Sequence, residues 1–91
     1  MGMSTIELAK AKDAVAAILE GLGLSAYLFE VEPRDGRWEL RMDCATAEGW
    51  QSLQLQVEKD RLLAAATDPA VREELARAWR GQLGACKTDA P

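Results

Sequence analysis

The sequence AYLFEVEPRDGRWELRMDC (residues 26–44) contains two arms in which apolar and polar residues alternate on either side of a turn. Such alternation is typical of β-strands with one buried face. In the turn, residues 33–36 (PRDG), proline presets φ for a type I turn and glycine accepts the positive φ that leads into the next strand. With Glu32 opposite Arg37, the hairpin places its large apolar side chains on one face. The predicted pairs are Val31 with Trp38, Phe29 with Leu40 and Tyr27 with Met42.

A third strand continues the same apolar face. Residues 46–49 (TAEG) form a second four-residue connection that ends in an acidic residue and glycine, and Ala45 is expected opposite Trp50. The further predicted pairs are Cys44 with Gln51, Met42 with Leu53, Leu40 with Leu55 and Trp38 with Val57. The second strand is therefore central. The other face is polar and solvated, with Leu28 and Trp50 as its apolar exceptions.

A helix is predicted before this sheet. Residues 4–7 (STIE) have the form of a capping box, in which Ser4 and Glu7 satisfy each other's backbone amides. Apolar residues then recur at spacings of three and four, and Gly21 and Gly23 end the helix. The predicted buried stripe consists of Leu8, Ala11, Val15, Ile18 and Leu22.

Two helical segments are predicted after the sheet. Residues 59–66 form a short helical turn that carries Leu62 and Leu63. Asp68 then caps a longer helix in which Pro69 takes the first position. Its predicted buried stripe consists of Val71, Leu75, Ala78, Trp79 and Leu83, and Gly84 terminates it.

The order of elements is α-β-β-β-(short α)-α, which predicts the α+β class. Three antiparallel strands with one apolar face need a cover, and two amphipathic helices supply it. We therefore expect a two-layer α/β sandwich, with a three-stranded antiparallel meander in the order 1-2-3 and both helices on one face. Residues 1–91 are expected to form a single domain, with disordered tails at 1–3 and 87–91.

The composition argues against an enzyme and against a metal site. The chain has 11 Lys and Arg against 15 Asp and Glu, and it has no histidine, the commonest general base and metal ligand. Cys44 and Cys86 lie in no C-x-x-C motif, and two thiols without histidine cannot build an ordinary zinc site. We expect free, reduced thiols, with Cys44 in the core, and no catalytic residue, cofactor or metal. The absence of a long apolar run predicts a cytoplasmic protein without a membrane span.

The polar face contains one candidate acid/base dyad. Glu30 and Glu39 are expected to face each other across the first hairpin on the polar face. Arg37 and Arg41 lie diagonally adjacent to them and relieve the repulsion. The pattern favours a solvated charged face over a catalytic pair.

The α-β-β-β-α order resembles that of the double-stranded RNA-binding domain, which implies nucleic-acid binding. That family begins its last helix with lysines and carries a histidine between its first two strands. Here the last helix begins with DPAVREE (residues 68–74), and the loop between the first two strands is PRDG (residues 33–36). On the surface of the last helix, Glu73 lies between Arg77 and Arg80. Small acidic secretion chaperones are also similar to this chain in charge and mixed α/β character.

These observations predict a non-enzymatic accessory or adaptor domain that binds protein, with a chaperone-like role as one form of it. The alternatives are a nucleic-acid-binding module and a carrier of a small ligand between helices and sheet. The candidate interaction residues are Trp50, Ser52, Gln54, Gln56 and Leu28. A homodimer through the uncharged strand of residues 51–57 is one expectation, and the other is that residues 59–66 cover that edge.

Overall fold

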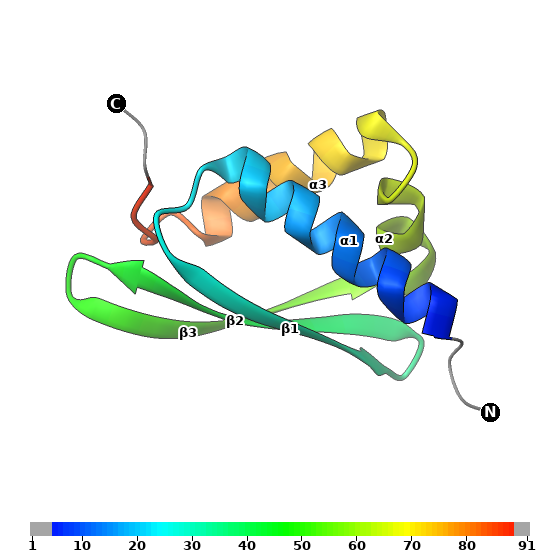
Figure 1. Ribbon diagram of the computed structural model, residues 1–91, viewed down its shortest axis with the longest axis horizontal. Helices are drawn as coiled ribbons and strands as arrows, with labels where there is room; N and C mark the ends of the chain where they lie inside the picture. The colour runs from blue at the N-terminus through cyan, green and yellow to red at the C-terminus, as the bar shows by residue number, and fades with distance from the viewer. Residues whose placement is uncertain (1–4, 89–91) are drawn as a thin grey trace.

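The computed structural model describes residues 5–88 and contains two layers, a helical layer over one face of a sheet (Figure 1). The elements are α1 (Thr5–Leu22), β1 (Tyr27–Arg34), β2 (Arg37–Thr46), β3 (Gly49–Glu58), α2 (Lys59–Ala65) and α3 (Pro69–Gln82). The sheet is antiparallel in the order β1-β2-β3. The predicted α+β sandwich and its element order are therefore confirmed.

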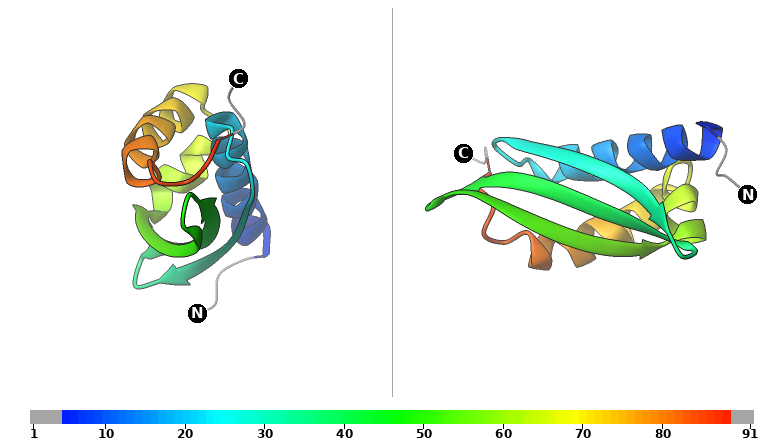
Figure 2. Two further views of the ribbon diagram at one scale, coloured as in Figure 1. Left: turned by 90° about the vertical axis from the view of Figure 1, so that its left-hand side faces the viewer. Right: turned by 90° about the horizontal axis from the view of Figure 1, so that it is seen from below.

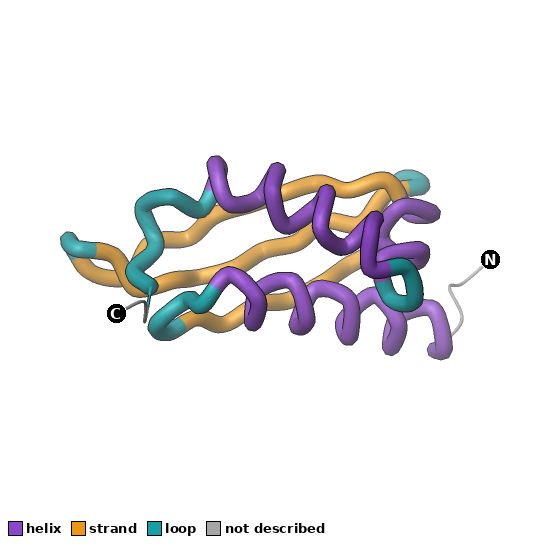
Figure 3. The backbone as a smooth tube through the Cα atoms, turned by 90° about the horizontal axis from the view of Figure 1, so that it is seen from above, coloured by secondary structure: helices purple, strands orange, loops and turns teal. Residues whose placement is uncertain are grey.

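The helices cover one face of the sheet and leave the other open (Figure 2). Seen from above, α1 and α3 run side by side over the strands, with α2 at one end of the pair (Figure 3). Both long helices contact each other and α2, and α1 also contacts β1. The β2–β3 turn projects beyond the helices at the opposite end (Figure 1).

The register of the second hairpin is the predicted one. Ala45 faces Trp50, and the four further predicted pairs are all present. Gly49 has a φ of 112°, which suits a residue without a side chain at the exit of the turn.

The predicted register of the first hairpin is wrong by two residues. Val31 pairs with Leu40 and Pro33 with Trp38, because the turn consists of Asp35 and Gly36 alone. Their φ values are 53° and 78°, the two positive angles of a type I′ turn, whose twist matches that of the strands better than a type I turn does. A shift of two residues keeps every side chain on its predicted face, so the burial pattern survives the error.

The core lies between the sheet and the helices. Trp38 is 1% exposed and is the largest fully buried side chain. The buried residues of α1 are Ala11, Ala14, Val15, Ile18 and Leu19, and those of α3 and its C-terminal cap are Leu75, Ala76, Trp79 and Leu83.

Two details of the predicted helix stripes need correction. Leu19 is buried in α1, whereas Leu8 and Leu22 are only partly buried at the two ends of the helix. In α3 the buried alanine is Ala76, and the predicted Ala78 is exposed. A helix that packs on both a sheet and a neighbouring helix buries a wider arc than a single stripe, and α3 directs this wider arc toward α1.

The capping prediction for α3 is confirmed, since the Asp68 carboxylate accepts a hydrogen bond from the Ala70 N–H at 2.9 Å and Pro69 is the first helical residue. The proposed cap of the first helix at Ser4 lies outside the described residues. The short helix at residues 59–65 is present, with Leu62 buried.

The expectation of free thiols is wrong. Cys44 and Cys86 form a disulfide with a Cα–Cα distance of 5.6 Å. Cys44 is fully buried, as predicted, but the sequence spacing of 42 residues gave no sign that the chain after α3 returns to the same end of β2.

The two residues after Cys86 are bound to β2 and to the segment that leads into β1. Lys87 donates its N–H to the Ala45 carbonyl at 2.7 Å and accepts from Ser25 at 2.8 Å. Thr88 forms a bridge with Leu24. These two residues belong to the tail that was expected to be disordered, and 89–91 lie outside the described range.

The substitution Trp38→Ala should lower the free energy of unfolding by about 3 to 5 kcal/mol, because it leaves a large cavity on the central strand. Urea unfolding followed by circular dichroism measures this loss. A change below about 1 kcal/mol would mean that the indole does not support the core.

The double substitution of Cys44 and Cys86 by alanine should cost about 2 to 4 kcal/mol, because the disulfide closes a long loop in the unfolded chain. Urea unfolding of the oxidised protein and the variant gives the difference. Thiol titration of the wild type in denaturant without reductant should find no free thiol, and two reactive thiols would contradict the disulfide.

Candidate protein-interaction surface

The open face of the sheet is built from the residues whose side chains point away from the helices. Its rows across the three strands follow from the register, for example Glu30–Arg41–Gln54 and Leu28–Asp43–Ser52. The face is polar along most of its length, as the alternation predicted. It is fully visible when the molecule is seen from below (Figure 2).

Charged side chains on this face are arranged in pairs. Arg41 lies 3.5 Å from Glu32, and Ser52 donates a hydrogen bond to Asp43 at 2.5 Å. Glu39 is only 7% exposed, and its carboxylate lies 3.8 Å from the Arg34 guanidinium. The two ion pairs neutralise the face locally.

The expected juxtaposition of Glu30 and Glu39 is wrong. The two-residue shift of the first hairpin places Glu30 opposite Arg41 and Glu32 opposite Glu39. Arg34 and Arg41 accompany these two acids, so the pair that does form is flanked by its own counter-charges. The arrangement is that of a charge-balanced strand pair.

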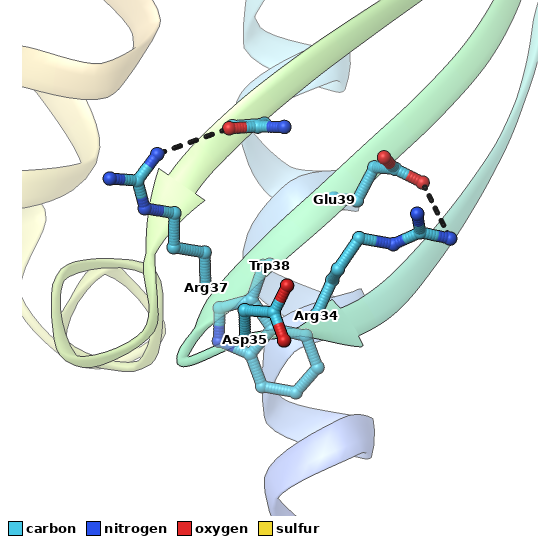
Figure 4. Close-up of a pocket in the computed structure, with 6 residues that line it drawn as sticks. Arg34, Asp35, Arg37, Trp38 and Glu39 are labelled. Carbon is cyan, nitrogen blue, oxygen red and sulfur yellow. Dashed lines mark hydrogen bonds and ion pairs between the residues drawn. The ribbon is translucent and has the colours of Figure 1, made fainter.

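A shallow hollow of about 270 Å³ lies near the β1–β2 turn, lined by Arg34, Arg37 and Glu39 among others. Figure 4 shows the two guanidinium groups directed to opposite sides of the turn, one toward Glu39 and the other away from it. Arg37 donates a hydrogen bond to the Gln56 side chain at 3.2 Å. Because the two cations diverge, they do not form a common anion site.

Two large apolar side chains project from the open face, as predicted. Leu28 is 66% exposed and Trp50 is 59% exposed. Trp50 lies at the start of β3, next to the turn that projects beyond the helices. An exposed indole with an apolar ring and one polar N–H suits a protein contact.

The outer backbone of β3 faces away from the sheet. Ala45 donates its N–H to the Ala26 carbonyl at 3.1 Å, so odd-numbered residues of β2 bond toward β1 and even-numbered ones toward β3. The even-numbered β2 residues pair with odd-numbered β3 residues. The alternate β3 residues therefore direct their N–H and C=O groups outward; they are Trp50, Ser52, Gln54, Gln56 and Glu58.

The two edges of the sheet are protected unequally against pairing with a further strand. On the edge of β1, the outward-facing positions include Pro33, which has no N–H to offer. The edge of β3 has no charged residue and no proline between Trp50 and Val57. It therefore lacks the features that usually prevent strand pairing.

The alternative in which residues 59–66 cover the β3 edge is not the arrangement in the structure. α2 turns onto the face that the helices cover, where its Leu62 and Ala65 are buried. The Trp38 indole N–H donates to the Lys59 carbonyl at 3.2 Å and fixes the start of this helix. The candidate residues Ser52, Gln54 and Gln56 are all exposed, and they lie together with Trp50 along the edge.

A second hollow, mainly apolar and about 500 Å³ in volume, lies beside the disulfide. It is formed where α1 and α3 end and the C-terminal segment crosses, and it is lined by Leu22, Leu24, Leu83, Cys86 and other residues. Arg80 stands at its margin. The hollow could not be predicted from the sequence because it depends on the disulfide, although the apolar Leu24 directly after Gly23 indicates renewed burial.

Within residues 5–88, no cluster of three or more potential metal ligands is present. None of the described helices is long and apolar enough to cross a membrane. Comparison with known proteins found no matching family, no matching curated protein and no matching solved structure.

Proposed function

We propose that this domain is a non-enzymatic accessory or adaptor protein that binds another polypeptide by strand addition at β3. The observation that carries the proposal is the outward-facing, uncharged backbone of β3 with the exposed Trp50 at one end. In strand addition, main-chain hydrogen bonds supply affinity and alternate side chains supply specificity. Trp50, Ser52, Gln54 and Gln56 alternate on the open face beside the incoming strand, whereas Leu28 lies across the sheet on β1.

Nucleic-acid binding is the weaker alternative because two cations at the α2–α3 junction, Arg72 and Arg61, are already engaged. The Arg72 guanidinium donates to the Ala65 and Ala66 carbonyls at 3.1 and 3.2 Å. Glu74 at the same end of the helix pairs with Arg61 at 3.3 Å. Phosphate binding needs several cations that are free to replace counter-ions, and the chain carries a net charge of −4.

The apolar hollow beside the disulfide supports a second candidate function, that of a small-ligand carrier. Its volume of about 500 Å³ falls within the range of ligand sites. The C-terminal ends of α1 and α3 contribute partial negative charge there, which offsets the positive charge of Arg80. A neutral, apolar ligand would therefore suit the hollow better than an anion.

The disulfide also bears on the cellular location that goes with this function. The sequence predicts both a cytoplasmic location and free thiols, and the Cys44–Cys86 bond removes the second of these expectations. Disulfides persist mainly in oxidising compartments. We therefore place the folded, partner-binding domain in such a compartment.

The substitution Gln54→Pro should abolish partner binding, because it removes an outward-facing backbone donor from the middle of the β3 edge. Gln54→Thr keeps that donor and serves as the matched control. Proteins that co-purify with the tagged domain from its native cell should be retained by the threonine variant and lost with the proline variant. Equal retention by two folded variants would contradict strand addition at β3.

The ligand hypothesis has its own test in the binding of the neutral apolar dye Nile red. If the hollow holds apolar ligands, Leu83→Gln should weaken dye binding severalfold, because it places a polar group on the hollow wall. Leu62→Gln, buried at the other end of the helical layer, controls for general loosening of the core. Dye binding that is absent from the wild type would exclude the carrier function.

A further inference from the structure

We propose that the partner at the β3 edge is a second copy of this chain, which pairs through two layers, β3 with β3 and α3 with α3. This inference rests on the proposed strand addition and names its partner. Two-fold pairing requires a surface that is complementary to itself. On the β3 side of this domain, both layers meet that requirement.

The sheet layer favours one register. The outward-facing residues of β3 run from Trp50 to Glu58, so a two-fold axis through Gln54, their midpoint, gives the longest ladder. Gln54 then faces its own copy, Ser52 faces Gln56, and Trp50 faces Glu58. No pair of like charges is opposed in this arrangement. An axis at Glu58 would instead oppose two glutamates and would shorten the ladder, because α2 begins at Lys59.

On the helix-covered face, the same register would place Leu53 beside Leu55 of the second copy. Leu53 is partly buried in the single chain, whereas Leu55 is buried. Pairing would therefore cover the part of Leu53 that solvent still reaches. Removal of this apolar surface from water adds to the backbone hydrogen bonds of the new ladder.

The helical layer provides the second surface. Ala76 and Arg80 line the groove between α3 and α1. At 100° per residue, Ala78 lies about 200° around the helix from Ala76, on the flank away from α1, and Val71 and Gln82 share that flank. Ala78 and Gln82 are exposed and Val71 is half-buried. Ala78, at the centre of this flank, is small, and the charged residue next to it, Glu74, is paired with Arg61 at 3.3 Å.

The β3 edge and this flank of α3 belong to the same side of the molecule. The strand order puts β3 at the sheet edge opposite β1, and α1 contacts β1 while α3 lies beyond α1 on the other side (Figure 2). A two-fold axis beside β3 would thus bring two α3 helices together over two β3 strands. The small Ala78 side chain permits the close approach of helices that a continuous six-stranded sheet would need.

The test uses opposite charges at the position on the two-fold axis. Gln54→Lys and Gln54→Glu each put two like charges face to face, and each should weaken dimerisation at least about fivefold. An equimolar mixture of the two variants should restore the dimer, because the charges are then opposite. Sedimentation velocity of wild type, each variant and the mixture measures this. Gln54 is exposed, so circular dichroism should show an intact fold in both variants.

The helical layer is tested separately with Ala78→Glu, which should also weaken the dimer severalfold by placing two carboxylates between the helices. Ala70→Glu is the matched control, because Ala70 is exposed on the same helix but points to solvent away from this flank. A dimer that tolerates Ala78→Glu but not the charges at Gln54 would overturn the helical half of the interface.

The outcomes separate this inference from the proposed function. A wild type that stays monomeric at high micromolar concentration would overturn the second copy as partner, while loss of other proteins from Gln54→Pro would still support strand addition. If the two Gln54 variants dimerise as strongly as the wild type, or if their mixture does not restore the dimer, the contact lies elsewhere and the inference is overturned.

Discussion

Burial of Trp38 is the interaction on which the rest of the domain depends. Its indole lies on the middle strand beneath the helical layer, and its N–H donates to the Lys59 carbonyl. A buried indole needs a partner for that N–H, and the backbone at the start of α2 supplies it. The chain leaving β3 is thereby directed onto the helix-covered face. One side chain thus fills the core and fixes the start of α2.

Most of the fold could be predicted because it follows from local patterns. The alternation in the strands, the Asp68-Pro69 start of α3 and the register of the second hairpin all depend on residues close together in sequence. The first register was missed because proline in the turn sequence suggested a type I turn. Asp35 and Gly36 formed a type I′ turn instead, and Pro33 took an edge position where its missing N–H costs nothing.

The features that could not be predicted depend on contacts between distant segments. The disulfide joins residues 42 positions apart, and the hollow beside it exists only where three chain segments meet. Likewise, the exposure of Ala78 depends on which flank of α3 faces α1, and a helical periodicity alone does not decide that. The candidate residues on β3 were predictable because a strand's parity and charge are local properties. Whether α2 would cover these residues could not be predicted from the sequence.

The disulfide has a consequence for the β3 side even though it lies at the other end of the core from Trp38. It ties the segment after α3 to β2, and the Lys87 N–H bonds to Ala45 on the same strand. α3 is therefore held to the central strand through its C-terminal end. Its other end is held to α2, where the Arg72 guanidinium donates to the Ala65 and Ala66 carbonyls. A helix anchored at both ends keeps its outer flank at a fixed distance from the β3 edge. Self-pairing through both layers needs that constant spacing. If α3 could move relative to the sheet, the β3 strands could pair without contact between the two α3 helices.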